Sequence, residues 1–328
     1  MKKLIIQDKI YGRFIITEPV IIDLLKSTAI LRLKEVSQLG PHDLHYSSPG
    51  YLNRYDHSVG VMLLLRQYGA ELNEQIAGLL HDISHTAFSH VSDYIFNSHA
   101  AQDYQDSKLE KAFEIQGINK ILKEHGINPK IILDHHRWPL LEKDLPDLCA
   151  DRIDYTLRDP SLGRVTNAKP RELLANLKTN SGQWFFTNRV WAKKFAVAYL
   201  KIAQLVWCNP TQSALFEIMA QAIKEGLAKN IITKKDLFTT DKNLLRLLKQ
   251  SKNKEIANRL QLLRVLKTKE VPKAQADFYT KSKPRAVDPY FQNRNGLIRL
   301  TKVDKPYQQR MNVWVAKAKK GFYIKIIN

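Results

Sequence analysis

The segment from residue 79 to residue 90, LLHDISHTAFSH, constrains this chain more than any other, because it places His81 and Asp82 side by side in an apolar helical context. Burying an ionised carboxylate is costly unless a charge partner or a metal stabilises it. His85 follows one helical turn later, and His90 lies beyond it. A single histidine on a helix is usually an ordinary core or surface residue, so the segment gains meaning only together with its neighbours.

Two further segments carry matching side chains. The tetrapeptide RYDH ends at His57, and DRIDY begins at Asp151. With His81 and Asp82 they supply two imidazoles and two carboxylates, which leaves part of an octahedral shell open for water and a substrate oxygen. Such mixed ligation suits Mn, Fe, Co, Ni or Zn, whereas Mg prefers oxygen ligands and is expected only with substrate phosphates. A bound metal of this kind lowers the pKa of water to about 7. We therefore predict one divalent transition metal beside acid and base groups.

Composition narrows the class of protein. Hydrophobic residues make up 44% of the 328 residues, which is typical of a globular chain. No apolar run approaches the roughly 20 residues that a membrane helix requires. The apolar stretch after MKK ends within three residues, far short of a signal peptide. Two cysteines, Cys149 and Cys208, cannot build a disulfide framework. We expect a cytoplasmic protein with no membrane partner.

The net charge of +20 is concentrated in the second half of the chain. Residues 1–160 hold 18 Lys and Arg against 22 Asp and Glu, whereas residues 161–328 hold 34 against 10. A basic half is typical of a surface that faces a polyanion, either nucleic acid or nucleotide phosphates. A lysine-rich solvated surface with no ligand is an equally good interpretation. Nucleic acid is therefore kept as a possible partner of the basic C-terminal half.

The hydrophobic pattern predicts a mainly α-helical core over residues 1–235 and a small basic α+β region over residues 236–328. A hairpin or extended arm is expected at residues 1–18, and a loop at residues 40–51. Helical spacing covers residues 19–39, 58–70, 74–85, 147–158, 171–178, 190–207 and 211–229. Residues 296–302, 311–317 and 321–327 alternate in polarity and are rich in β-formers, which predicts a short antiparallel sheet.

The runs NRYDHSVGV, LLHDISHTAFSH and CADRIDYTLRD, in this order, resemble the HD-domain superfamily of metal-dependent phosphohydrolases. They are most similar to the deoxynucleoside triphosphate triphosphohydrolase branch, which includes the sterile-alpha-motif/HD enzyme and bacterial dGTPases. The preceding RLKEVSQLG is similar to the same branch. The resemblance covers residues 8–165 well and residues 166–235 loosely. It implies a helical HD-domain core, cleavage of a dNTP to a deoxynucleoside and triphosphate, and a possible homo-oligomer.

The resemblance also implies a role for individual residues. Four positions match the metal ligands of the family: His57, His81, Asp82 and Asp151. Three match its catalytic groups: His85 and His90, which contact phosphate and serve the leaving group, and Asp93, which orients His90. Six match its substrate contacts: Arg54 and Arg152 on the phosphates, Tyr155 and Asp159 near the sugar, and Gln38 and Leu39 against the 3′ edge of the deoxyribose.

The chain departs from the family pattern in three places, one of which is VWCNP at residues 206–210, where relatives place a tyrosine-containing stretch over the base and sugar. Tyr104 and Gln105 stand where relatives often hold a His-Glu pair, with His99 as a possible replacement, and Lys26 stands where an acidic residue reads an activator guanine. Two other functions stay open. One is a nucleoside monophosphatase or phosphodiesterase that uses the same metal site, because one fold supports several phosphoryl reactions. The other is a nucleic-acid-binding or regulatory module with a vestigial site.

Overall fold

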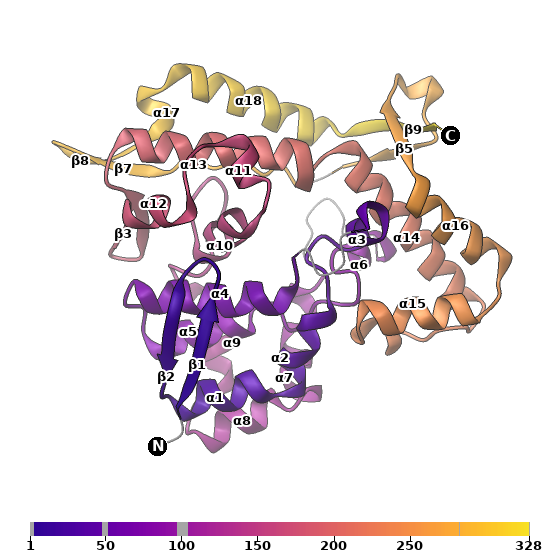
Figure 1. The fold of residues 1–328 in the computed structure, drawn as a ribbon, viewed down its shortest axis with the longest axis horizontal. Coiled ribbons are helices and arrows are strands. Elements are labelled where there is room, and N and C mark those ends of the chain that lie inside the picture. The colour runs from indigo at the N-terminus through magenta and orange to yellow at the C-terminus, as the bar shows by residue number, and fades with distance from the viewer. Residues whose placement is uncertain (1–2, 48–51, 97–103, 282, 328) are drawn as a thin grey trace.

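The computed structural model describes residues 3–47, 52–96, 104–281 and 283–327, and it confirms a mainly α-helical chain with small sheets (Figure 1). In the view of Figure 1 the N-terminal helices form the lower part of the molecule. The long helices α13 (Arg189–Ile202) and α18 (Lys305–Lys320) form a layer above them, and α14 (Pro210–Ala228), α15 (Asp241–Gln250) and α16 (Lys254–Val265) form one side. Among the described residues, no helix is both long and apolar enough to cross a membrane.

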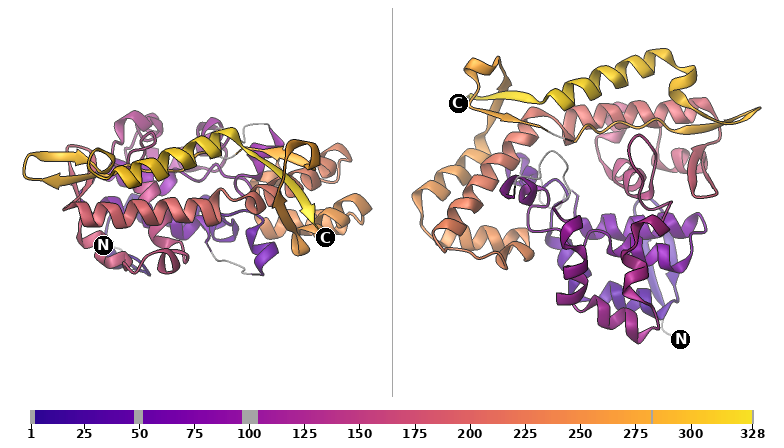
Figure 2. Two further views of the ribbon diagram at one scale, coloured as in Figure 1. Left: turned by 90° about the horizontal axis from the view of Figure 1, so that it is seen from above. Right: turned by 180° about the vertical axis from the view of Figure 1, so that it is seen from behind.

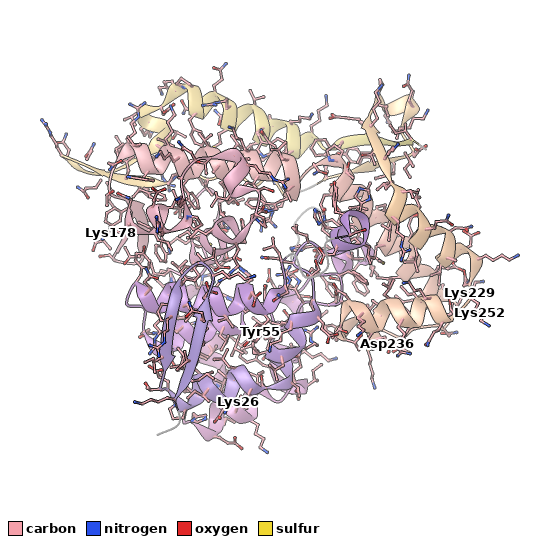
Figure 3. All side chains as sticks on the ribbon, viewed as in Figure 1. Lys26, Tyr55, Lys178, Lys229, Asp236 and Lys252 are labelled. Carbon is pink, nitrogen blue, oxygen red and sulfur yellow. The ribbon has the colours of Figure 1, made fainter. Side chains whose placement is uncertain are left out.

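The chain begins with the predicted hairpin, in which β1 (Leu4–Asp8) pairs antiparallel with β2 (Gly12–Ile16). The helix expected over residues 19–39 is divided into α1 (Pro19–Lys26) and α2 (Thr28–Arg32). The division falls at Ser27, which leaves helical geometry and accepts the N–H of Ile30 at 3.3 Å, so it caps the second helix. Figure 3 labels Lys26 at the end of α1, in the lower part of the molecule.

Three helices build the centre of the lower part: α4 (Arg54–Gln67), α5 (Leu72–Leu80) and α10 (Ala150–Arg158), with α4 packed against both others. α4 begins at Arg54 because the side chain of Asn53 accepts the N–H of Asp56 at 2.8 Å. In α10 an acidic residue lies in the first turn and a basic residue in the last, which complements the helix dipole.

The helix expected over residues 74–85 ends at Leu80, and residues 81–90 form turns. Hydrogen bonds in this segment span three residues, as from the N–H of His85 to the carbonyl of Asp82 at 3.1 Å. Phe88 and Ser89 have positive φ angles of 58° and 50°, which ends helical geometry. The turns allow side chains that a helix would spread around its axis to face one cavity.

Short helices fill the connections between the longer ones. One of them, α3 (His42–Tyr46), lies within the predicted loop at residues 40–51, so that expectation was wrong for these residues. The other short helices are α6 (Val91–Ile95), α7 (Leu109–Ile115), α8 (Ile118–Glu124), α9 (Pro129–Leu133), α11 (Leu162–Val165), α12 (Pro170–Ala175) and α17 (Leu300–Val303). A π-helical turn, Ala203–Trp207, joins α13 to α14.

Two small sheets lie in the second half of the chain. The first has the order β3 (Leu177–Asn180), β4 (Gln183–Phe186), β7 (Tyr290–Asn293), β8 (Gly296–Arg299), and its central β4–β7 pair is parallel. The second is antiparallel, with the order β5 (Lys267–Glu270), β9 (Phe322–Ile327), β6 (Phe278–Thr280). The predicted short sheet near the C-terminus is therefore present, but its strands differ from those expected.

Residues 311–317, predicted as a strand, belong to helix α18 instead. The buried side chains of α18 are Tyr307, Trp314 and Ala318, whose spacing of seven and four residues is helical. The apolar alternation within MNVWVAK therefore lies in a longer segment whose buried residues have helical spacing. α18 packs along α13, and the view from above in Figure 2 shows the two helices side by side.

The hydrophobic core does not separate cleanly by position in the chain. Tyr307, Trp314 and Phe322 join the same cluster of buried side chains as the N-terminal helices. A second cluster gathers around α14, α15 and α16 and includes Phe88. The division of the chain into domains at residue 235 stays a prediction.

Candidate active site

A cavity of about 460 Å³ opens where α4, the turns of residues 81–90, α10, the π-helical turn and the segment before β7 meet. Ten of the thirteen residues predicted from the sequence line this cavity: Gln38, Leu39, Arg54, His81, Asp82, His85, His90, Asp151, Arg152 and Tyr155. The other three, His57, Asp93 and Asp159, are buried behind its wall. The structure thus brings together segments that lie far apart in the sequence.

Two histidines lie at the base of the cavity, His81 in its lining and His57 buried directly behind it, and each is oriented by its outer nitrogen. His57 is fully buried, and its Nδ1 lies 2.7 Å from Oδ2 of Asp154. The Nδ1 of His81 lies 2.7 Å from the carbonyl oxygen of Gly78. These acceptors hold a proton on Nδ1, so that Nε2 is the nitrogen of each ring that faces the carboxylates and is available to a metal. The two rings are 5.1 Å apart between centroids.

Two carboxylates face these Nε2 atoms. Asp151 Oδ1 lies 3.0 Å from Nε2 of His57 and 3.7 Å from Nε2 of His81. Asp82 lies 3.7 Å from Nε2 of His57 through Oδ2 and 3.5 Å from Nε2 of His81 through Oδ1. Arg54 Nη1 also donates to Oδ2 of Asp82 at 2.5 Å. The four side chains predicted as metal ligands therefore converge on one point.

The residues of this cluster fit a divalent metal. One ligand atom from each of His57, His81 and Asp151 lies within 4.8 Å of the others. Within the part of the chain that the structure describes, the buried Nε2 of His81 has no hydrogen-bond partner, as expected for an atom reserved for a cation. Two nitrogens and carboxylate oxygens are a donor set for Mn, Fe, Co, Ni or Zn.

The pKa shifts of the cluster also fit a bound cation. Burial alone would raise the pKa of Asp151, but the hydrogen bond with His57 and the nearby imidazole of His81 hold it well below its usual range. Burial would likewise raise the pKa of Asp82, but Arg54, His81 and His85 together outweigh it and hold this pKa well below its usual range. The pKa of His57 is raised to about 9, because its two carboxylate partners outweigh burial. A cation that bound His57 would displace that proton, which makes metal affinity depend on pH.

Two more histidines line the wall above the cluster. His85 Nε2 lies 3.2 Å from Oδ1 of Asp82, and burial together with the charge of Arg54 lowers the pKa of His85 to about 3. His90 Nδ1 lies 2.9 Å from Oδ2 of the fully buried Asp93, which orients the ring as predicted. Burial lowers the pKa of His90 as well. The cavity thus holds two imidazoles besides the metal cluster.

The guanidinium groups predicted to bind phosphate are both fixed by neighbours. Arg54 Nε donates to Ser89 Oγ at 2.8 Å, in addition to its bond with Asp82. Arg152 Nη2 donates to Glu142 Oε1 at 3.0 Å, and its Nη1 lies 3.0 Å from Cys149 Sγ. Fixed guanidinium groups lose little entropy when an anion binds.

The residues predicted to surround the sugar lie on two sides of the cavity. Tyr155 contacts Tyr199 through their hydroxyl groups, 2.6 Å apart, and Trp207 packs edge-on against Tyr155. Asp159 does not line the cavity, because it accepts the Trp207 Nε1–H at 2.8 Å. On the other side, the carbonyl of Leu39 accepts the amide of Gln212 at 2.8 Å. Asp159 therefore affects the cavity indirectly, by holding the Trp207 ring in place.

The structure describes two of the three residues named at the position of the missing His-Glu pair. Gln105 lines the cavity, whereas Tyr104 is not among its lining residues and stacks on Phe96. His99, considered as a replacement for the missing histidine, lies outside the described residues.

Sequence reasoning missed several residues of the site. Asp154 orients His57, and the spacing of two carboxylates in DRID was the only signal for it. Trp207, in the π-helical turn, lines the cavity as well. Glu142, Lys283 and Arg285 also line it, but they come from irregular segments that no sequence pattern connects to the histidines.

A helical core that carries a His, a His-Asp pair and a distant Asp to one cavity floor defines an HD-type phosphohydrolase fold. Comparison with known proteins agrees, because the HD domain matches residues 54–159. The chain is 31% identical over 266 residues to the metal-dependent phosphohydrolase cns2 of Cordyceps militaris, covering 77% of this chain and 75% of that protein. It is 37% identical over 324 residues to the uncharacterized protein YdhJ of Bacillus subtilis, covering 98% and 99%. The chain belongs to the HD-domain family of metal-dependent phosphohydrolases.

More distant proteins share the fold. A phosphohydrolase of Bacteroides thetaiotaomicron superposes with a TM-score of 0.73 at 15% identity, over 98% of this chain and 99% of that one. The SAMHD1 homolog of Dictyostelium discoideum, named a deoxynucleoside triphosphate triphosphohydrolase, is 22% identical over 310 residues, covering 82% of this chain and 59% of that protein.

Proposed function

We propose that this phosphohydrolase cleaves deoxynucleoside triphosphates to deoxynucleosides and triphosphate. The observation that carries the proposal is the pair His85 and His90 on the wall above the metal cluster, with their rings 5.2 Å apart. A site that only held a metal and a monophosphate would not need both. The similarity to proteins named deoxynucleoside triphosphate triphosphohydrolases supports the same reaction.

The protein groups divide the work of such a reaction. A divalent metal held by His57, His81, Asp82 and Asp151 would supply a strong nucleophile from water and polarise a phosphoryl oxygen. Arg54 and Arg152, already fixed by their neighbours, offset the charge of the phosphates.

His90 delivers a proton to the departing 5′ oxygen. Asp93 behind the ring holds Nδ1, so that Nε2 faces the cavity and the imidazolium is stabilised when it forms. Because burial lowers the pKa of His90, the negative charge of the substrate must raise that pKa before the ring can act as an acid.

The test is product analysis. The full-length protein is incubated with each dNTP and each dNMP in Mn or Mg, and products are separated by chromatography beside a His81→Ala/Asp82→Ala control. Triphosphate with deoxynucleoside, lost in the control, is the expected result. Orthophosphate or pyrophosphate as the only inorganic product from dNTPs would contradict it.

A nucleoside monophosphatase or phosphodiesterase is the second candidate. It is favoured by Gln105, which lines the cavity close to where relatives often hold a His-Glu pair and so removes one acid/base group. Phosphate released from dNMPs alone would establish it. The nucleic-acid-binding alternative predicts a log–log salt slope near −0.9 for each phosphate contacted on duplex DNA, and a flat response would remove it. A homo-oligomer stays a prediction that light scattering can check.

A further inference from the structure

A segment from the C-terminal region reaches the catalytic cavity. Residues 283–289, called the strap here, have no regular secondary structure and connect β6 to β7. Lys283 and Arg285 of the strap line the cavity, although they lie more than a hundred residues beyond the HD-domain match at residues 54–159. The strap therefore adds two positively charged side chains to the lining of the cavity.

Arg285 lines the cavity and contacts Tyr155. Its Nη1 is 3.3 Å from the hydroxyl of Tyr155, and its guanidinium carbon is 5.6 Å from the centre of that ring. Tyr155 follows Asp151 by one turn of α10, so Arg285 is close to the cluster. Its charge also contributes to the lowered pKa of His90 on the opposite side. An anion bound above the cluster would lie within reach of this guanidinium.

The backbone of the strap is anchored before any substrate arrives. The carbonyl of Arg285 accepts the Nε1–H of Trp314 at 3.1 Å, and the carbonyl of Val287 accepts the hydroxyl of Tyr307 at 2.5 Å. The N–H of Asp288 donates to the carbonyl of Pro146 at 2.8 Å, in the loop that leads to α10. A cation held by three such anchors is preorganised for an anion.

The other charged side chains of the cavity leave a need for additional positive charge. Arg54 shares its charge with Asp82, and Arg152 shares its charge with Glu142. A triphosphate carries several negative charges, which two partly neutralised guanidinium groups offset incompletely. The strap supplies further positive charge on the same wall.

We propose that Arg285 binds a phosphate group of the substrate, with Lys283 beside it, so that the C-terminal region completes the catalytic site. The inference rests on the proposed function in that it takes a nucleotide as substrate. It assigns part of the basic charge of the second half to nucleotide phosphate. Arg285 is then a determinant of specificity for the number of phosphates.

The first measurement is binding of inorganic tripolyphosphate to the full-length, metal-loaded protein by calorimetry, which needs no turnover. Arg285→Gln should weaken this affinity about 10- to 100-fold, the loss of one charge-assisted contact. Arg285→Lys should fall between, because lysine keeps the charge but not the bidentate fork. Arg294→Gln is the matched control, since Arg294 is exposed in the β7–β8 turn. Its affinity should equal that of the wild type.

The second measurement determines kcat and KM for a nucleotide that the wild type cleaves. In a parallel assay, guanidinium is added to Arg285→Ala to replace the missing group. Arg285→Gln should raise KM for a triphosphate more than for a monophosphate. Guanidinium should restore part of the activity of Arg285→Ala. Deoxynucleoside affinity should not change.

The outcomes separate the two proposals. Arg285-dependent binding of tripolyphosphate without turnover of any nucleotide would refute the proposed function and support the inference. An active Arg285→Gln variant with wild-type tripolyphosphate affinity would overturn the inference and leave the function standing. Loss of bound metal or of thermal stability in Arg285→Gln, with no rescue of Arg285→Ala by guanidinium, would also overturn it, because the residue would then be structural.

Discussion

Substitution of Gly60 by alanine gives the sharpest test of how α4 and α10 hold the site. Gly60 lies one turn after His57, where the two helices cross. A Cβ atom at this position would lie 2.0 Å from Nη2 of Arg158 and 2.1 Å from Oδ1 of Asp154. Neither side chain can yield easily, because Arg158 bonds Asp154 at 2.9 Å and Asp8 at 2.8 Å, and all are buried or nearly so.

Two effects of opposite sign set the magnitude. Helix propensity alone favours alanine over glycine by about 1 kcal/mol in the free energy of unfolding. Displacing Arg158 breaks its buried ion pair with Asp154, which costs about 3–5 kcal/mol. We therefore expect Gly60→Ala to lower the free energy of unfolding by about 2–4 kcal/mol.

Urea denaturation with an unchanged m value measures this difference. Gly163→Ala is the matched control, because Gly163 is also helical and a Cβ there would meet nothing within 4 Å. The control should equal the wild type or gain up to about 1 kcal/mol. A Gly60→Ala protein as stable as the control would refute the close approach of α4 and α10. It would also refute the conclusion that Arg158 and His57 together fix Asp154.

Three other predictions follow from the site. Asp154→Asn should weaken metal affinity about 10- to 100-fold, because it removes the charge that orients His57, and a metal titration followed by calorimetry checks this. Removing metal with a chelator should lower the melting temperature of the wild type, since a ligand at 100 times its Kd stabilises by about 2.7 kcal/mol, whereas His81→Ala should show no such shift. Burial raises the pKa of Asp241 to about 7 despite two backbone N–H bonds, so the native state binds more protons than the unfolded chain between about pH 4 and pH 7. The stability of the wild type relative to Asp241→Asn should therefore fall as pH rises through that window, and a difference independent of pH would contradict the raised pKa.

The sequence predicted the helical class and the convergence of the site because these depend on local patterns and on motifs with fixed spacing. His57, His81, Asp82 and Asp151 lie in three such motifs, and the structure places them together. Their assignment as metal ligands stays a prediction, which the metal titration above can check.

Other features depend on contacts that no local pattern records. The segment at residues 311–317 alternates like a strand, but burial of Trp314 against α13 and the strap makes it helical. The turns after Leu80 follow from packing rather than propensity, since the carbonyl of Leu237 accepts the N–H of Ala87 at 2.7 Å. Arg285 reaches the site only because the strap is anchored by residues far away in the sequence.

The parallel pairing of β4 with β7 has a consequence for the order of folding. Phe185 faces Tyr290 in this pair, so the strands that meet at the centre of the sheet are separated by more than a hundred residues. Contacts of such sequence separation form late and slow the folding of a domain. During synthesis the HD helices leave the ribosome long before β7 and the strap. The residues proposed to hold the metal are therefore synthesised in the first half of the chain, whereas Lys283 and Arg285 can join the cavity only when nearly all of the chain has been made.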